Sequence, residues 1–268
     1  MIARLCRLGA PHLRGAAGRP TCALTGLIPL LRGALLAACL ATLAGGAAAQ
    51  APAKPDSKLD TTVVEAREAA RKRDRNRLAA AKAAMQAGAH PLTPWVEYWD
   101  LTSRLPDVQV EDVEAFYTRW SGSYVEDRLR NDWLLELGRR RDWPALARDY
   151  PRFRMNDDRE VSCWWLFTEH LAGKEVADAA RPLWFAQREV DDGCNLLATA
   201  LVDGKRFSQD DVYRKARLSL EMQRPGAAKA ALGLLGNGIA REAAEALDNP
   251  ARYLRRGAPI SRHAQELR

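Results

Sequence analysis

Residues 128–153 read RLRNDWLLELGRRRDWPALARDYPRF and carry the clearest helical pattern in the chain. Apolar side chains recur here and just upstream at every fourth position: Val125, Leu129, Trp133 and Leu137. This spacing predicts the buried face of an α-helix, which we expect to end at Gly138. Asp142 can cap a second helix, and Pro144 falls within its first turn. The stretch therefore predicts two helices joined by a short turn with aromatic residues at the joint.

The chain from Leu59 onward continues in the same helical pattern. Residues 59–87, rich in Ala, Arg, Lys and Glu, predict one long helix that Gly88 ends, and Thr93 is the expected N-cap of the next. Further helices are expected at 93–105, 111–120, 159–172, 175–187, 192–203, 208–223, 225–235, 238–247 and 250–256. Short helices with short connections and no strand alternation predict an all-α fold, a curved α-solenoid (superhelix) of short helical hairpins. A compact helical bundle is the alternative architecture.

The first 49 residues predict an export signal. Arginines precede an apolar run from Leu24 to Leu43, and small residues ending at Ala49 form a signal-peptidase site. Pro29 and Arg32 interrupt the apolar run, which argues against a membrane-spanning helix. A lipoprotein anchored through Cys39 is a minor alternative. We assign residues 1–49 to the signal peptide, 50–58 to a linker and 59–268 to the superhelical domain, expected to be truncated at its C-terminus.

The charge balance gives no support to a nucleic-acid partner. The chain has 41 Lys and Arg against 34 Asp and Glu, but five of the arginines lie in the first fifty residues, which contain no acid. Removing them leaves 36 basic against 34 acidic residues. The mature protein is therefore close to neutral and lacks the basic excess of a nucleic-acid-binding domain.

Two cysteines remain after signal cleavage, Cys163 and Cys194. In an oxidising compartment such a pair is a candidate disulfide, which would stabilise the fold by roughly 3–4 kcal/mol on the chain-entropy model. The alternative is two buried free thiols.

No residue pattern predicts a catalytic or metal centre. The chain has neither an H-x-x-x-H pair nor cysteine–histidine spacing for zinc, and Cys163 and His170 lie too far apart along one helix for a dyad. Acidic pairs lie at the starts of predicted helices, at 157–158, 191–192 and 210–211, where capping explains them. We therefore assign no catalytic residue, no metal and no cofactor. Most tryptophans lie on apolar helix stripes and predict core packing.

Several segments, taken together, resemble one known family. LRNDWLLELGRRRDWPALARDYPRF is similar to the N-terminal helical domain of the soluble lytic murein transglycosylases, through Leu129, Arg130, Trp133, Leu134, Asp142, Trp143 and Tyr150. HPLTPWVEYWDLTSRL resembles the family's upstream aromatic helix. Cys163-Trp164-Trp165 and the Leu183-Trp184 segment leading to Cys194 resemble its two cysteine segments, although Asn195 replaces the usual aspartate.

The resemblance implies a periplasmic superhelix that positions peptidoglycan glycan strands for a lysozyme-like catalytic domain. That domain cleaves the β-1,4 bond between N-acetylmuramic acid and N-acetylglucosamine, and leaves a 1,6-anhydro product. Its Glu-Ser signature occurs nowhere in this sequence, so no catalytic residue is carried over. Candidate glycan contacts are the arginines at the turn: Arg139, Arg140 and Arg141. A periplasmic solenoid adaptor that binds protein partners is the alternative function. The oligomeric state is not predicted.

Overall fold

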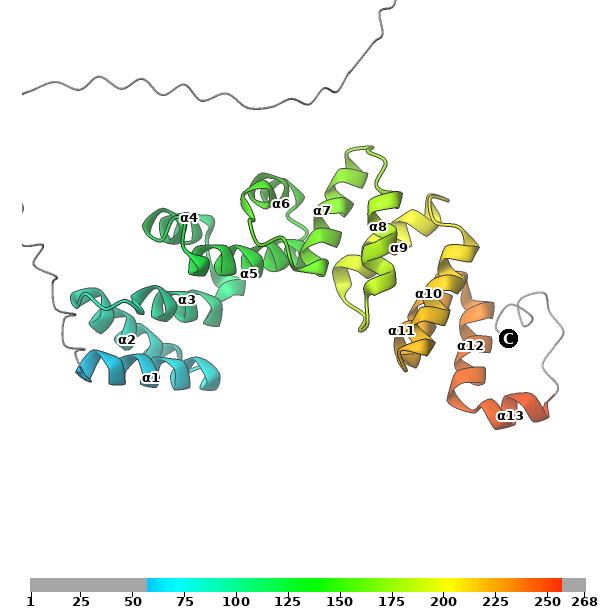
Figure 1. Ribbon diagram of the computed structural model, residues 1–268, viewed down its shortest axis with the longest axis horizontal. Helices are drawn as coiled ribbons and strands as arrows, with labels where there is room; N and C mark the ends of the chain where they lie inside the picture. The colour runs from blue at the N-terminus through cyan, green and yellow to red at the C-terminus, as the bar shows by residue number, and fades with distance from the viewer. Residues whose placement is uncertain (1–56, 257–268) are drawn as a thin grey trace, which may run out of the picture. The chain divides into compact units, whose positions relative to one another are not determined.

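The computed structural model describes residues 57–256, which belong to one compact unit. Within this range the chain forms α-helices and two short 3-10 helices, and no strand (Figure 1). Their bounds are α1 Ser57–Lys72, α2 Arg75–Ala87, α3 Thr93–Ser103, η1 Leu105–Asp107, α4 Val110–Arg119, α5 Tyr124–Arg140, α6 Trp143–Asp149, η2 Tyr150–Arg152, α7 Arg159–Leu171, α8 Ala177–Ala186, α9 Asp192–Asp203, α10 Gln209–Glu221, α11 Pro225–Gly233, α12 Asn237–Asp248 and α13 Pro250–Arg255. The predicted signal peptide, the candidate lipid anchor at Cys39, most of the predicted linker and the tail 257–268 lie outside the described residues.

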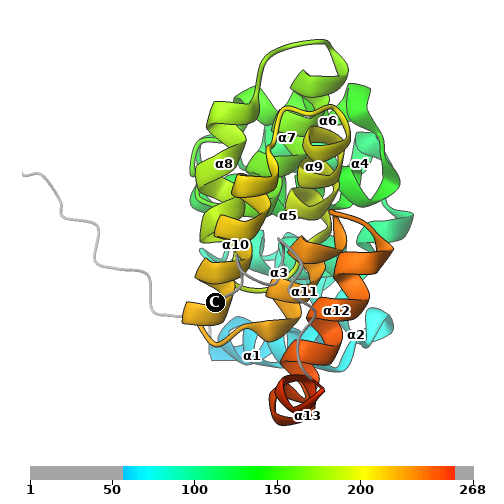
Figure 2. The ribbon, with the colours of Figure 1, turned by 90° about the vertical axis from the view of Figure 1, so that its right-hand side faces the viewer.

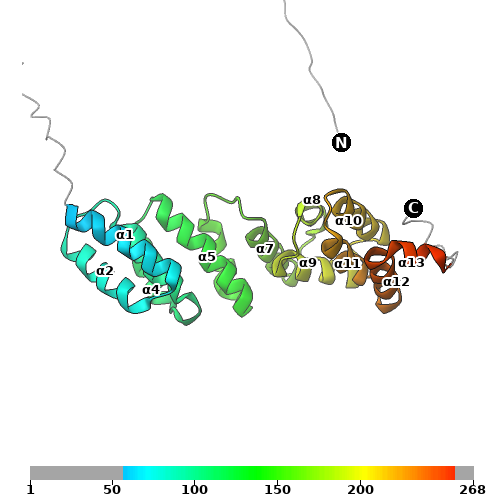
Figure 3. The same cartoon turned by 90° about the horizontal axis from the view of Figure 1, so that it is seen from below.

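The helices pack mainly against near neighbours in the chain. The main pairs are α1 with α2, α2 with α3, α5 with α6, α7 with α9, α10 with α11 and α11 with α12. The helices follow one another in chain order from α1 to α13 (Figure 3), and Figure 2 turns the α12–α13 end toward the viewer. Packing between successive hairpins is the defining property of a solenoid. The predicted all-α solenoid is confirmed, and the compact bundle is not what forms.

The hydrophobic core is correspondingly divided into clusters along the chain. One holds α1 to α3 together, a second lies around α5, a third surrounds the α7–α9 joint, and a fourth joins α10 to α12. Each cluster contains side chains with almost no exposed surface, such as Leu78, Leu129, Leu201 and Leu232. The stability of such a protein is a sum of local units and the interfaces between them.

The turn between α5 and α6 confirms the predicted helix pair but moves its cap. The prediction that Gly138 ends the first helix is wrong, because α5 continues to Arg140 and Arg141 adopts the left-handed conformation at φ 59°. Gly138 is required for another reason: a Cβ atom there would lie 2.5 Å from Nε1 of Trp164. Asp142 caps α6 as predicted.

The predicted single helix 59–87 is wrong as well. The chain reverses after α1 through Arg73, at φ 55°, and Asp74, whose carboxylate accepts a hydrogen bond from the N–H of Arg77. The two halves pack as a hairpin and bury Leu78 and Met85 between them and α3. Neither Gly nor Pro occurs at this break, and helix propensity therefore predicted one continuous helix across it.

A smaller correction concerns the start of α3. The N-cap is Leu92, and Thr93 is the first helical residue. The Thr93 hydroxyl donates to the carbonyl oxygen of His90 at 2.8 Å and so fastens the preceding turn. Gly88 ends α2 as predicted.

Candidate functional site

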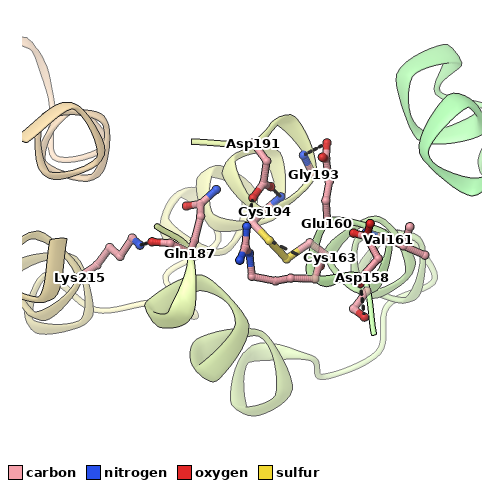
Figure 4. Close-up of a disulfide and its surroundings, with 11 residues drawn as sticks. Asp158, Glu160, Val161, Cys163, Gln187, Asp191, Gly193, Cys194 and Lys215 are labelled. Atoms are coloured by element: carbon pink, nitrogen blue, oxygen red, sulfur yellow. Dashed lines mark hydrogen bonds and ion pairs between the residues drawn. A yellow bond between two sulfur atoms is a disulfide. The ribbon is translucent and has the colours of Figure 1, made fainter. Parts of the chain in front are cut away.

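The two cysteines within the described residues form a disulfide between α7 and α9 (Figure 4). The sulfur atoms of Cys163 and Cys194 are bonded, and both residues are fully buried in the third core cluster. The predicted disulfide is confirmed and the free-thiol alternative is wrong. Because the Cys163 sulfur is already bonded, a dyad with His170 is also ruled out.

One residue of each acidic pair caps a helix. Asp158 accepts from the N–H of Val161, and Asp191 accepts from the N–H of Cys194 at 2.8 Å. Asp211 forms a reciprocal capping box with Ser208 at the start of α10. The capping interpretation of these pairs is confirmed.

A buried lysine in α10 was not predicted from the sequence. Lys215 of α10 is 1% exposed and donates to the carbonyl oxygen of Gln187, which follows α8 (Figure 4). Burial, and secondarily the charge of Arg159, lowers the pKa of Lys215 to about 8. Lys215 lies between Val212 and Ala216, so the apolar face of α10 surrounds it, and that is the only sequence signal of its burial.

A second buried charge cluster centres on Arg130 of α5, which is 1% exposed. Its guanidinium donates to Glu126 at 2.6 Å and to Asp149 of α6, and lies 3.9 Å above the ring of Tyr117. Burial raises the pKa of the Tyr117 phenol well above its usual value. Nearby, Asp127 accepts from two backbone N–H groups of the loop before α7. The cluster fastens α4, α5 and α6 together, so Arg130, which carries part of the family resemblance, has a packing role.

The three candidate arginines at the end of α5 make different contacts in the structure. Arg140 pairs with Glu136 at 2.9 Å and donates to the backbone carbonyl oxygen atoms of Leu105 and Pro106 at 2.8 and 2.9 Å. Arg140 is therefore a structural clamp between α5 and η1. Arg139 is exposed, pairs with Glu136 at 3.0 Å and lines a pocket, whereas Arg141 does not line it.

This pocket, which we call the arginine pocket, encloses about 540 Å³. It lies where the α1–α2 turn, the C-terminal end of α3, η1 and the end of α5 meet, and α3 packs against both α1 and α5 (Figure 1). Its lining residues are Ala70, Arg73, Arg75, Trp99, Thr102, Ser103, Leu105, Pro106 and Arg139. Guanidinium groups from distant segments thus surround a half-buried indole.

A larger pocket, of about 770 Å³, opens between α2, the turn at His90, α3 and α4. The carboxylate of Glu97, 3% exposed, lies at this pocket and accepts hydrogen bonds from Gln86, Arg119 and Trp120 at 2.7–2.8 Å. Both oxygens are therefore already engaged. The arrangement joins three helices and does not provide a free general acid.

All eight tryptophans lie within the described residues, and none is exposed. Trp133, Trp164 and Trp184 are buried, and the other five are half-buried. The core-packing prediction is confirmed, while Trp99 and Trp120 also line the two pockets.

Within residues 57–256, His, Cys, Asp and Glu side chains form no group of three or more that could hold a metal ion. In the same range no helix has the length and apolar character to span a bilayer.

No protein-family model matches the chain, and no curated protein matches its sequence. Among solved structures, the 70 kDa soluble lytic transglycosylase Slt70 from Escherichia coli is similar, with a TM-score of 0.57 and 18% identity. Its complex with bulgecin A gives a TM-score of 0.56 at the same identity. In both cases the likeness covers 79% of this chain and 35% of the other, so the chain spans about a third of those proteins. At this identity, the likeness establishes a shared helical fold.

Proposed function

We propose that this chain is a peptidoglycan-binding scaffold, equivalent to the N-terminal superhelix of a soluble lytic murein transglycosylase. One observation carries the proposal: the helices match those of a lytic transglycosylase over 79% of this chain. The sequence segments that resemble the family point the same way. In this proposal the helices position glycan strands, and bond cleavage belongs to a catalytic domain that residues 57–256 do not contain.

The chemistry of the described residues is consistent with a binding role without cleavage. One acid at each of three helix starts is engaged as a cap, and the Glu97 carboxylate accepts hydrogen bonds from three residues. A lytic reaction needs a carboxyl group that can donate and then accept a proton at the glycosidic oxygen.

Sedimentation with purified sacculi tests the proposal. The protein should co-sediment with sacculi and should not co-sediment with cellulose, which has β-1,4-linked sugars but no N-acetyl, lactyl or peptide groups. It should release no anhydromuropeptides from the sacculi. Equal retention on both polymers, or none on either, would contradict the scaffold function, and product release above background would contradict the absence of cleavage.

Export to the periplasm is part of the same proposal. Cleavage after Ala49 gives a mature chain that begins at Gln50, and the mass of the purified periplasmic protein checks it. A mass that includes a lipid on Cys39 would favour the lipoprotein alternative.

The second candidate function is a periplasmic adaptor that binds proteins. Capture from periplasmic extract separates the two functions when it is repeated after the murein fragments have been digested. Retention that is lost on digestion supports the scaffold, and retention that persists on a protein partner supports the adaptor.

A further inference from the structure

We propose that the arginine pocket binds carboxylate groups, and, resting on the proposed function, that these are the free carboxylates of the peptide stems on glycan strands. The pocket is thus assigned to the peptide part of the polymer and not to its sugar rings. The lining is the first reason: Arg73, Arg75 and Arg139 contribute to it, and no acidic side chain does.

The guanidinium groups have hydrogen-bonding capacity to spare. The side chain of Arg73 is exposed, and its guanidinium has no hydrogen-bond or ion-pair partner within the described part of the chain. Arg139 shares the single carboxylate of Glu136 with Arg140. Arg75 pairs with Asp107 at 3.2 Å, and both side chains are more than half exposed. Exposed ion pairs contribute little stability, so a ligand carboxylate can replace Asp107 at small cost.

The positive charge at the pocket is therefore only partly neutralised. Four guanidinium groups, including that of Arg140 beside it, face the carboxylates of Asp107 and Glu136, which leaves a local charge of +2. A planar guanidinium forms two parallel hydrogen bonds to a carboxylate, which makes arginine well suited to that group.

The remaining lining favours an organic anion over a small inorganic one. Trp99 is half-buried, and its indole provides an apolar wall against which an aliphatic or sugar face can pack. The hydroxyls of Thr102 and Ser103 donate to carbonyl oxygens of their own helix at 2.9 and 2.7 Å, so they present acceptor lone pairs to the pocket. These acceptors suit the amide N–H groups that lie beside carboxylates in a peptide stem.

The fold explains why the three arginines meet. The left-handed turn at Arg73 and the cap at Asp74 reverse the chain, which places Arg73 and Arg75 on either side of a sharp corner. The end of α5 brings Arg139 to the same corner through α3, although 66 positions separate it from Arg73 in the sequence. The stacking order of the hairpins therefore places the three arginines at one corner, on backbone that helix packing holds in place.

Calorimetric titration of the whole mature chain with soluble muropeptides tests the assignment. Three ligands are compared: muropeptides with free carboxylates, the same muropeptides after carbodiimide amidation of those carboxylates, and the peptide-free disaccharide with the lactyl carboxyl group of its N-acetylmuramic acid amidated. Loss of the charge-assisted hydrogen bonds should weaken binding by about tenfold or more on amidation. The peptide-free disaccharide should bind as weakly as the amidated ligand.

Variants place the effect in the pocket. Arg73→Gln and Arg139→Gln should each weaken binding of the free-carboxylate ligand by about tenfold and leave the amidated ligand unaffected. Arg148→Gln is the matched control, because Arg148 is also exposed and without an ion-pair partner in the described range but lies on α6 outside the pocket. Arg141→Gln should also leave binding unchanged, and equal melting temperatures show that all four variants fold.

The outcomes separate this inference from the proposed function. Equal binding of free and amidated muropeptides overturns the carboxylate assignment, while retention on sacculi would still support the scaffold. A loss in Arg141→Gln as large as in Arg139→Gln would assign binding to the arginine triplet and overturn the pocket. If inorganic phosphate displaces muropeptides at the same concentration as acetate does, the pocket binds any anion. That result would also overturn the carboxylate assignment. Binding of free-carboxylate muropeptides without retention on sacculi would support the pocket and contradict the scaffold.

Discussion

Removal of the disulfide should unfold one region of the solenoid more easily and leave the other end unchanged. The bond between Cys163 and Cys194 closes a loop with a sequence separation of 31, and that loop contains α8. The chain-entropy relation gives about 3.7 kcal/mol for a loop of this length at 25 °C. This is a large part of the 5–15 kcal/mol typical of a whole domain.

The test is the double variant Cys163→Ala/Cys194→Ala. Alanine is preferred to serine because both positions are fully buried and a hydroxyl there would have to be desolvated. Urea unfolding followed by circular dichroism should show a loss of about 3–4 kcal/mol, and the melting temperature should fall by about 10 °C. The wild-type protein, reduced in mild urea and returned to buffer with reductant, should match the variant.

Hydrogen exchange adds a spatial readout. Because α7 and α9 pack directly together and α8 packs on both, amide protection should fall across these three helices. Helices α1 to α3, which have their own core cluster, should exchange as in the wild type. Reductant should have no effect on the double variant. A reduced wild type as stable as the oxidised form, or a loss of protection spread evenly over all helices, would refute the reasoning.

Three further predictions concern buried contacts. Gly138→Ala should destabilise the protein by about 1–3 kcal/mol in urea titrations because its Cβ atom would overlap the ring of Trp164, whereas Gly226→Ala, where nothing lies within 4 Å, should be neutral or slightly stabilising. The pKa of Lys215 is lowered to about 8 in the folded state, so above that pH the folded state binds fewer protons than the unfolded state. Relative to Lys215→Met, the free energy of unfolding of the wild type should therefore rise by about 2 kcal/mol between pH 7 and pH 9.5. A difference between the two proteins that does not change with pH would contradict this. Arg130→Met leaves buried carboxylates unpaired and should cost about 3–5 kcal/mol, measured by thermal and urea unfolding; a loss below about 1 kcal/mol would show that the carboxylates are neutralised by other means.

The parts of the fold that could be predicted from the sequence are those that depend on local chemistry. Helix starts at Asp142, Asp158 and Asp191 were predictable because a short acidic side chain before an apolar stripe can satisfy the first free N–H groups of a helix. The disulfide was predictable because only two cysteines lie outside the predicted signal peptide. The break at Arg73 was not predicted, because neither Gly nor Pro marks it and the one local signal, the capping residue Asp74, lies within a run of strong helix formers.

The arginine pocket shows the other limit of sequence analysis. Arg139 was a candidate contact, but its neighbour Arg140 was grouped with it although the structure directs that side chain to the carbonyl oxygens of η1. Arg73 and Arg75 lie in another helix pair, and no local pattern associates them with Arg139. Only the order in which the hairpins stack brings the three side chains together.

The residues that carry the family resemblance are those that hold the helices together. Trp133 lies in the core around α5, Asp142 caps α6, and Arg130 is the centre of a buried ion cluster. Cys163 and Cys194 cross-link α7 and α9. Such residues fix how neighbouring hairpins pack. They can therefore produce the same architecture in this chain and in Slt70 although the two sequences are only 18% identical. Ligand specificity depends instead on exposed side chains that do not contribute to the stability of the fold. The exposed arginines of the pocket are of this kind, because none of them takes part in a core cluster. Substitution of these arginines should therefore change binding while the solenoid stays intact, and that separation is what allows the proposed function to be tested independently of the fold.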